Sequence, residues 1–237
     1  MPKNTLRSLF LYVCPLIVFT VLLNAGCLSK QGTVSHVKSL PIRAGKIVVF
    51  GFRPAMPKGY EPGVMRSPVS GAVFMAEPVP LDVTNRMTDS LFSRLLEYER
   101  YELVDSDQAR GVFSSLVESN QGMNDMDIVQ KIGQAFSADG VMIGYIYRWQ
   151  EREGSDYSVH RPASAAFDLY LIRPDDRAIL WKGRFDKTQV SLSENILDVG
   201  AFIKGKGLWM TVDELAELGL NELLDRTHKG GKVERKD

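Results

Sequence analysis

Few residues in this sequence could carry out covalent or metal chemistry. The chain has two cysteines, Cys14 and Cys27, and three histidines, His36, His160 and His228. Their spacing does not match a zinc site, which uses closely spaced cysteine and histidine ligands. A Ser–His–Asp triad would have to use His160, because the other two histidines lie in an expected tether and in the tail. Neither a Walker-type phosphate loop nor a dinucleotide-binding glycine pattern is present. We therefore predict no catalytic site, no metal and no cofactor.

Cys27 has the most specific sequence surroundings. Two basic residues precede an apolar run over residues 8–23, and two small residues, Ala25 and Gly26, stand directly before Cys27. This order of charge, apolar run and small residues is the layout of a secretory signal. The run is shorter than the roughly 20 residues that a membrane-spanning helix needs. We expect residues 1–26 to be a signal peptide that is removed.

The sequence LNAGC at 23–27 resembles the bacterial lipobox, where cleavage precedes a lipid-modified cysteine. Ala25 and Gly26 match the pattern, whereas Asn24 departs from it, since that position is usually apolar. An ordinary signal peptide with a chance cysteine is the alternative. Cleavage would also remove Cys14 and leave Cys27 as a lone thiol, a liability in an oxidising compartment that lipidation would remove.

The resemblance to a lipobox implies a permanent membrane anchor on Cys27. A diacylglyceryl thioether with an N-linked acyl chain places three chains in the bilayer, and each buried methylene contributes about 0.8 kcal/mol. Leu28 follows the cysteine. In enterobacterial lipoproteins an aspartate there implies retention in the inner membrane, so the resemblance favours the outer membrane, on its periplasmic face.

The composition indicates a globular domain. Hydrophobic residues make up 44% of the chain and charged residues 24%, and the formal net charge is zero. A surface that follows nucleic-acid phosphates would need a basic excess, so we do not expect a nucleic-acid partner.

Together with the signal layout and the lipobox resemblance, the sequence pattern predicts four segments. These are the signal (1–26), the lipidated cysteine and tether (27–43), a periplasmic α/β domain (44–226) and a charged tail (227–237). In the domain we expect a first strand at 46–52, a short strand at 101–104, and long strands at 141–149, 165–173 and 178–185. Helices should begin near Leu81, after a cap at Ser106, after Asn124 or Asp125, and at a capping box over 211–214. This order predicts an α/β (α+β-like) fold, with helices packed on a mixed, mainly antiparallel sheet in a single domain.

Residues 53–80 interrupt this pattern. The segment holds six prolines and an apolar patch at 72–76. Loops longer than about 12–15 residues are usually functional or disordered. Phe74 and Met75 are therefore candidate partner-docking residues, and the alternative is that they pack onto the core.

Four segments resemble a domain of bacterial envelope proteins. They are KIVVFGF at 46–52, RYELVDSDQARGVFSSL at 100–116, IGQAFSADGVMIGYIYRW at 132–149 and FDLYLIRPDDRAILWKGRF at 167–185. The series is similar to the domain shared by lipoprotein activators of penicillin-binding proteins, the curli secretion channel lipoprotein and the amino-terminal domain of the Tol-system propeller protein. The matching residues shape the fold, among them Gly140, Gly144 and the buried ring expected at Trp181, and they do not define a function.

These observations favour a non-catalytic outer-membrane lipoprotein that docks on an envelope protein partner. Two alternatives remain: a subunit of an oligomeric secretion pore, and an accessory lipoprotein of a transport system. A homo-oligomer is compatible with each of them.

Overall fold

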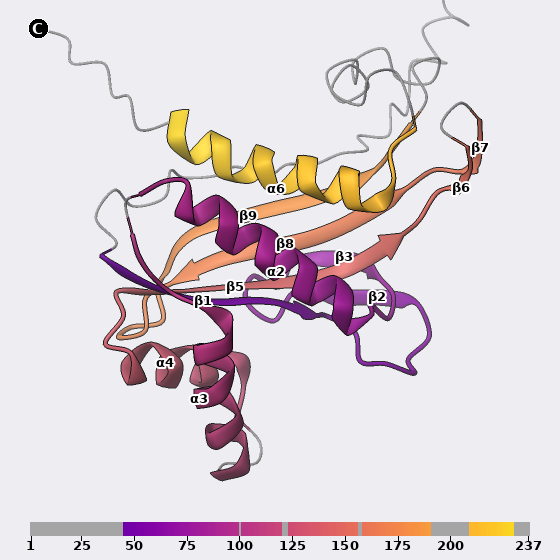
Figure 1. The fold of residues 1–237 in the computed structure, drawn as a ribbon. Helices are drawn as coiled ribbons and strands as arrows, with labels where there is room; N and C mark the ends of the chain where they lie inside the picture. Colours follow the sequence, from indigo (N-terminus) through magenta and orange to yellow (C-terminus); the bar gives the residue numbers. More distant parts are fainter. Residues whose placement is uncertain (1–44, 100, 120–122, 156–157, 191–208, 230–237) are drawn as a thin grey trace, which may run out of the picture. The chain divides into compact units, whose positions relative to one another are not determined.

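The structure is a computed structural model that describes residues 45–99, 101–119, 123–155, 158–190 and 209–229. The chain separates into two compact units, 1–31 and 32–237, and all described residues belong to the second. Its largest sheet has five strands in the order β4-β1-β5-β8-β9 (Figure 1). The pairings of β1 with β4 and β5 are parallel, whereas β8 pairs antiparallel with both β5 and β9.

The order of elements is the one that the sequence predicts, with small additions. The strands are β1 (Lys46–Pro54), β2 (Gly63–Arg66), β3 (Val73–Ala76), β4 (Glu102–Val104), β5 (Gly140–Gln150), β6 (Glu153–Gly154), β7 (Val159–Arg161), β8 (Ser164–Ile172) and β9 (Ile179–Thr188). The helices are α2 (Leu81–Leu96), α3 (Ser106–Ser119), α4 (Asp125–Ala135) and α6 (Val212–Lys229). β2–β3 and β6–β7 are separate antiparallel pairs. The predicted fold class, a single α/β domain with a mixed sheet, is confirmed.

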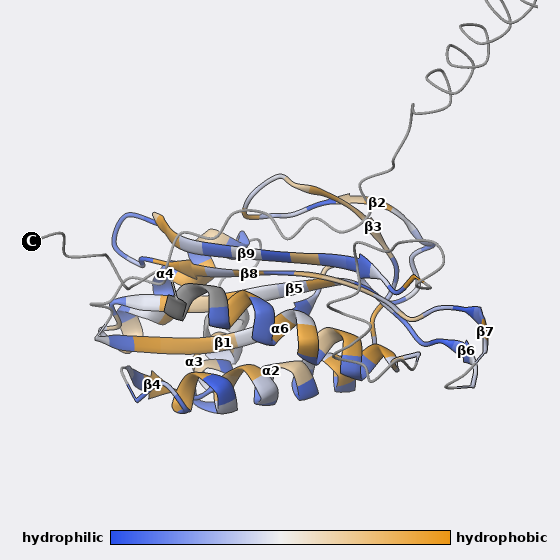
Figure 2. Ribbon diagram, turned by 90° about the horizontal axis from the view of Figure 1, so that it is seen from above, coloured by the Kyte–Doolittle hydropathy of each residue, from blue (hydrophilic) through white to orange (hydrophobic). Residues whose placement is uncertain are grey.

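The five-stranded sheet is covered on both faces, which explains its continuous apolar strands. β1 places Ile47 and Val49 on one face and Val48 and Phe50 on the other, and all four are buried. Figure 2 shows β1 as hydrophobic over most of its length. Alternation of side chains along a strand sends neighbours to opposite faces, so a strand between two layers must be apolar throughout.

Helices α2 and α6 cover the first face (Figure 1). Their buried stripes pack against Trp181 and Phe185 of β9 and against Phe167 of β8. Trp181 is 1% exposed, so the prediction that its ring covers the sheet is confirmed. Burial of several large rings in one layer supplies much of the hydrophobic stabilisation of the domain.

Helices α3 and α4 and the β2–β3 hairpin pack on the second face. β1 bends near Gly51, where the register with β5 shifts and the backbone has φ +84°. A side chain at Gly51 would meet Thr88, whose hydroxyl accepts a hydrogen bond from the Phe52 amide at 2.8 Å. Only glycine fits this left-handed position so close to α2.

The helix caps partly follow the sequence prediction. Asn124 caps α4 in a capping box with Asp127, and Thr211 and Glu214 form the predicted box at α6. The predicted cap at Ser106 is wrong. The Asp105 carboxylate instead accepts hydrogen bonds from the first amides of α3, because an ionised oxygen is the stronger acceptor.

Two segments differ from expectation in extent. The sequence predicts a loop over residues 53–80, yet this segment contains the β2–β3 hairpin. α6 continues to Lys229, past the expected start of the tail at residue 227. None of the described helices is long and apolar enough to cross a membrane.

Candidate functional site

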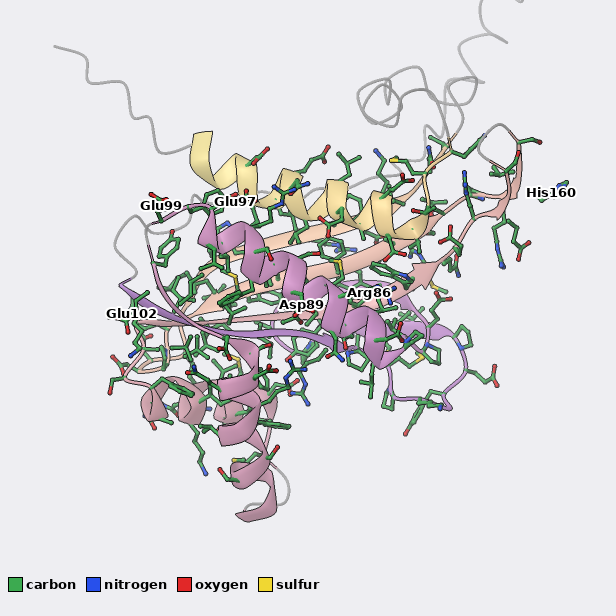
Figure 3. All side chains as sticks on the ribbon, in the orientation of Figure 1. Arg86, Asp89, Glu97, Glu99, Glu102 and His160 are labelled. Atoms are coloured by element: carbon green, nitrogen blue, oxygen red, sulfur yellow. The ribbon has the colours of Figure 1, made fainter. Side chains whose placement is uncertain are left out.

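The residues predicted for lipidation and cleavage, Cys27, Ala25 and Gly26, lie outside the described residues. His36 also lies outside them, as does the side chain of His228. His160 lies on β7, at the outer end of the small β6–β7 pair, and points away from the domain (Figure 3). Over the described ranges no three histidine, cysteine or acidic side chains come close enough to hold a metal ion.

The structure separates the two candidate docking residues, Phe74 and Met75. Both lie on β3, where burial alternates, so Phe74 is 2% exposed and Met75 is 57% exposed. The Phe74 ring stacks on Tyr147 of β5, with ring centroids 3.7 Å apart and planes 5° from parallel. Phe74 cannot present its side chain to a partner while the hairpin is packed in this way. Of the two, Met75 is the one with an exposed side chain.

Arg184 of β9 fixes the hairpin from the other side of Phe74. Its guanidinium carbon lies 4.0 Å from the centre of the Phe74 ring, and Nη2 donates a hydrogen bond to the Val73 carbonyl at 3.0 Å. A cation over an aromatic face is worth about 2 kcal/mol when both groups are shielded from water. The inner side of the hairpin is therefore held by β5 and β9 together.

A buried polar cluster lies beneath the turn of the hairpin. The hydroxyls of Tyr147 and Tyr170 donate to Asp168 Oδ2 at 2.9 and 2.6 Å. The Tyr170 oxygen also lies 2.9 Å from the Ser67 hydroxyl and 2.7 Å from the Ser70 hydroxyl. Since Ser67 and Ser70 belong to the turn between β2 and β3, these contacts tie the turn to β5 and β8.

Asp168 is the one strongly perturbed carboxyl group of this cluster. It is 1% exposed, and burial raises the pKa of Asp168 from 3.8 to about 6. The hydroxyls of Tyr170, Ser67 and Tyr147 and the charge of Arg184 oppose this shift by stabilising the ionised form. Its second oxygen, Oδ1, has no hydrogen-bond partner in the described part of the chain. Burial also raises the pKa of the Tyr147 and Tyr170 hydroxyls, which therefore act as hydrogen-bond donors at neutral pH.

The outer side of the hairpin is apolar and exposed. Val64 pairs with Met75 and Arg66 pairs with Val73, and these four side chains point outward. Val64 is 67% exposed and Val73 44%. We call Val64, Arg66, Val73 and Met75 the hairpin outer face. Tyr60, 65% exposed, lies shortly before β2.

The apolar segment is visible in the sequence, whereas the polar cluster that positions it is not. The available signal was Asp168 itself, the only charged residue in the buried strand Ser164–Ile172. A carboxyl group in a strand whose two faces are both covered is buried, and a buried carboxyl group requires hydrogen-bond partners. Which partners these would be depends on the pairing of strands far apart in sequence.

Comparisons with known proteins identify no family for this chain. No protein-family model matches the sequence, and no curated protein matches it. Several solved structures match the chain, with TM-scores below 0.5. The dodecamer of a PelC variant from Paraburkholderia phytofirmans matches at 14% identity with a TM-score of 0.45, covering 81% of this chain and 95% of that one.

Two further matches are a domain of LpoB and a lipoprotein. The LpoB C-terminal domain from Escherichia coli matches at 15% identity with a TM-score of 0.34, over 62% of this chain and 84% of that one. Lipoprotein GNA1162 from Neisseria meningitidis matches at 15% identity with a TM-score of 0.38, covering 73% of this chain and 96% of that one. The predicted resemblance to a domain of envelope lipoproteins, the activators of penicillin-binding proteins among them, is confirmed. At these identities and TM-scores the matches assign neither a family nor a function to this chain.

Proposed function

We propose that this chain is a non-catalytic lipoprotein, anchored through Cys27 on the periplasmic face of the outer membrane, that docks an envelope protein through the hairpin outer face. The support for the anchor is the signal layout before Cys27 and the lone thiol that lipidation would remove. The anchor would hold the domain close to its partner and raise the effective concentration for docking.

The single observation that carries the docking role is the distribution of exposed apolar side chains. Seven large hydrophobic side chains are exposed in the described part of the chain, and four of them, Tyr60, Val64, Val73 and Met75, lie within residues 60–75. Isolated exposed apolar residues are normal, whereas clustered ones indicate interaction sites. Tyrosine, methionine and arginine are also the residues enriched in protein interfaces.

The polar cluster and the ring stack support the same role. They hold the inner side of the hairpin against the sheet through Phe74, Ser67 and Ser70. The outer face is thereby fixed before a partner arrives, which lowers the entropy lost on binding. A hairpin of two four-residue strands would be marginal by itself, so these contacts are what make the surface rigid.

Photo-crosslinking in intact cells tests the proposal. A photoreactive residue replaces Val64, Val73 or Met75 one at a time in the full-length protein, and Leu96 serves as a control because it is an exposed leucine (54%) on α2. We expect one envelope protein to be captured from all three hairpin positions and not from Leu96. Capture from Leu96 but from none of the hairpin positions would place the docking surface elsewhere.

A further inference from the structure

Arg66 is an unusual member of the hairpin outer face. Arg66 pairs with Val73 and lies on the same exposed face of the hairpin as Val64 and Met75. Its guanidinium donates one long hydrogen bond, from Nη1 to the Gly71 carbonyl oxygen at 3.4 Å. A guanidinium has five N–H donors, so most of its hydrogen-bonding capacity is directed to solvent.

The other arginines of this domain are mostly neutralised within the chain. Nine of them form ion pairs with carboxylates in the described residues: Arg53, Arg86, Arg94, Arg110, Arg148, Arg161, Arg173, Arg177 and Arg184. Arg66 forms no ion pair with a described residue. The exposed apolar patch thus contains an arginine to which the described part of the chain supplies no carboxylate.

We infer that the docked partner is a protein segment that presents a carboxylate flanked by apolar side chains. This inference rests on the proposed docking function and specifies the chemistry of the partner. The carboxylate would accept two parallel N–H bonds from the Arg66 guanidinium, the geometry in which arginine binds carboxylates best. Apolar neighbours would cover Val64, Val73 and Met75 and remove the ion pair from water.

Two other occupants fit the surface less well. Anionic lipid headgroups attract clusters of several lysines and arginines, whereas this face has a single cation and the chain has no net charge. In a two-fold contact between copies of this hairpin, the same patch would face itself. Both sides would then present Arg66, and the two cations would repel each other.

The test combines crosslinking from Met75 with reversal of the charge at Arg66. The full-length lipidated protein carries the photoreactive residue at position 75, and the adduct is digested so that the attached partner peptide can be sequenced. We expect an aspartate or glutamate next to the attachment site. Arg66→Glu should lower the adduct yield about tenfold, and Arg66→Lys, which keeps the charge but loses the fork of donors, should lower it less. Arg161→Glu, the same change in the β6–β7 pair, is the matched control and should leave the yield unchanged.

Charge reversal on the partner completes the test. Replacing the identified partner carboxylate by lysine should restore the adduct in the Arg66→Glu protein and reduce it in the Arg66 protein. An unchanged yield with Arg66→Glu, while the same protein is still captured, would overturn this inference and leave the docking function standing. Capture of lipid alone, or of a second copy of this chain, would also overturn it. Absence of any adduct from the three hairpin positions would refute the docking function itself.

Discussion

Replacement of Asp168 by asparagine should change how the stability of the domain depends on pH. The asparagine side chain would keep the size and the acceptor oxygen that Tyr147 and Tyr170 use, but it cannot ionise. In the native protein the carboxyl group is 1% exposed and its pKa is raised from 3.8 to about 6, mainly by burial. The variant therefore imitates the protonated form at every pH.

The raised pKa of Asp168 determines both the sign and the size of the stability difference between the native protein and the Asp168→Asn variant. Because the folded state binds the proton more tightly than the unfolded state, protonation of Asp168 stabilises the fold fully below about pH 3.8. This stabilisation is lost as the pH rises through about 6, where the buried group ionises. A shift of about two pKa units corresponds to roughly 3 kcal/mol. We expect Asp168→Asn to be more stable than the native protein by up to about 3 kcal/mol at pH 7.5, and by little at pH 4.

Urea unfolding of the full-length protein, followed by tryptophan fluorescence between pH 4 and 7.5, measures this difference. Other carboxyl groups contribute equally to both proteins, including Asp176, whose pKa is lowered by a hydrogen bond from the Ala178 amide. Asp107→Asn, at a side chain 89% exposed on α3, controls for the substitution itself. A stability difference that stays constant across this pH range would refute the reasoning, since it would show that Asp168 does not titrate differently in the two states.

Three further predictions concern the anchor and the core. Cys27→Ser should abolish incorporation of labelled palmitate, and equal labelling of both proteins would contradict lipidation of Cys27. Trp181→Ala should destabilise the domain by about 3–5 kcal/mol, because it removes a ring that is 1% exposed; an unchanged melting temperature would argue against its burial. Gly144→Ala should cost about 1–3 kcal/mol in urea unfolding, since its new Cβ would lie 2.5 Å from the Phe52 ring and 2.9 Å from the Asp168 carbonyl oxygen. Gly111→Ala, with nothing within 4 Å on α3, should instead be neutral or stabilising by up to about 1 kcal/mol.

The long elements could be predicted from the sequence because local patterns determine them. β5 and β8 are mostly apolar runs of a length typical of strands between two layers, and α2 repeats its buried residues every four positions. The turn at 174–177 can also be predicted, since proline presets its backbone angle. In the structure the Arg173 amide donates a hydrogen bond to the Ala178 carbonyl across this turn. At these places the local preference and the tertiary environment agree.

The β2–β3 hairpin could not be predicted in the same way. Its strands have four residues each, and six prolines in the surrounding segment suggested a loop. Short strands with two inward and two outward side chains give almost no periodic signal. The hairpin is determined by contacts with β5, β8 and β9, which lie far along the chain from it and which no local pattern reveals.

Phe74 is buried and Met75 is exposed, and this difference could not be predicted without the tertiary structure. The sequence does not distinguish the two residues, because both are large, apolar and adjacent. In a strand, adjacent side chains point to opposite sides, so only one of them could face a partner. Tyr147 and Arg184 determine which side chain points inward. They enclose the Phe74 ring between an aromatic face and a cation, and Met75 therefore points outward. Loss of docking on mutation of Phe74 would consequently report on the seating of the hairpin, whereas loss on mutation of Met75 would report on the interface.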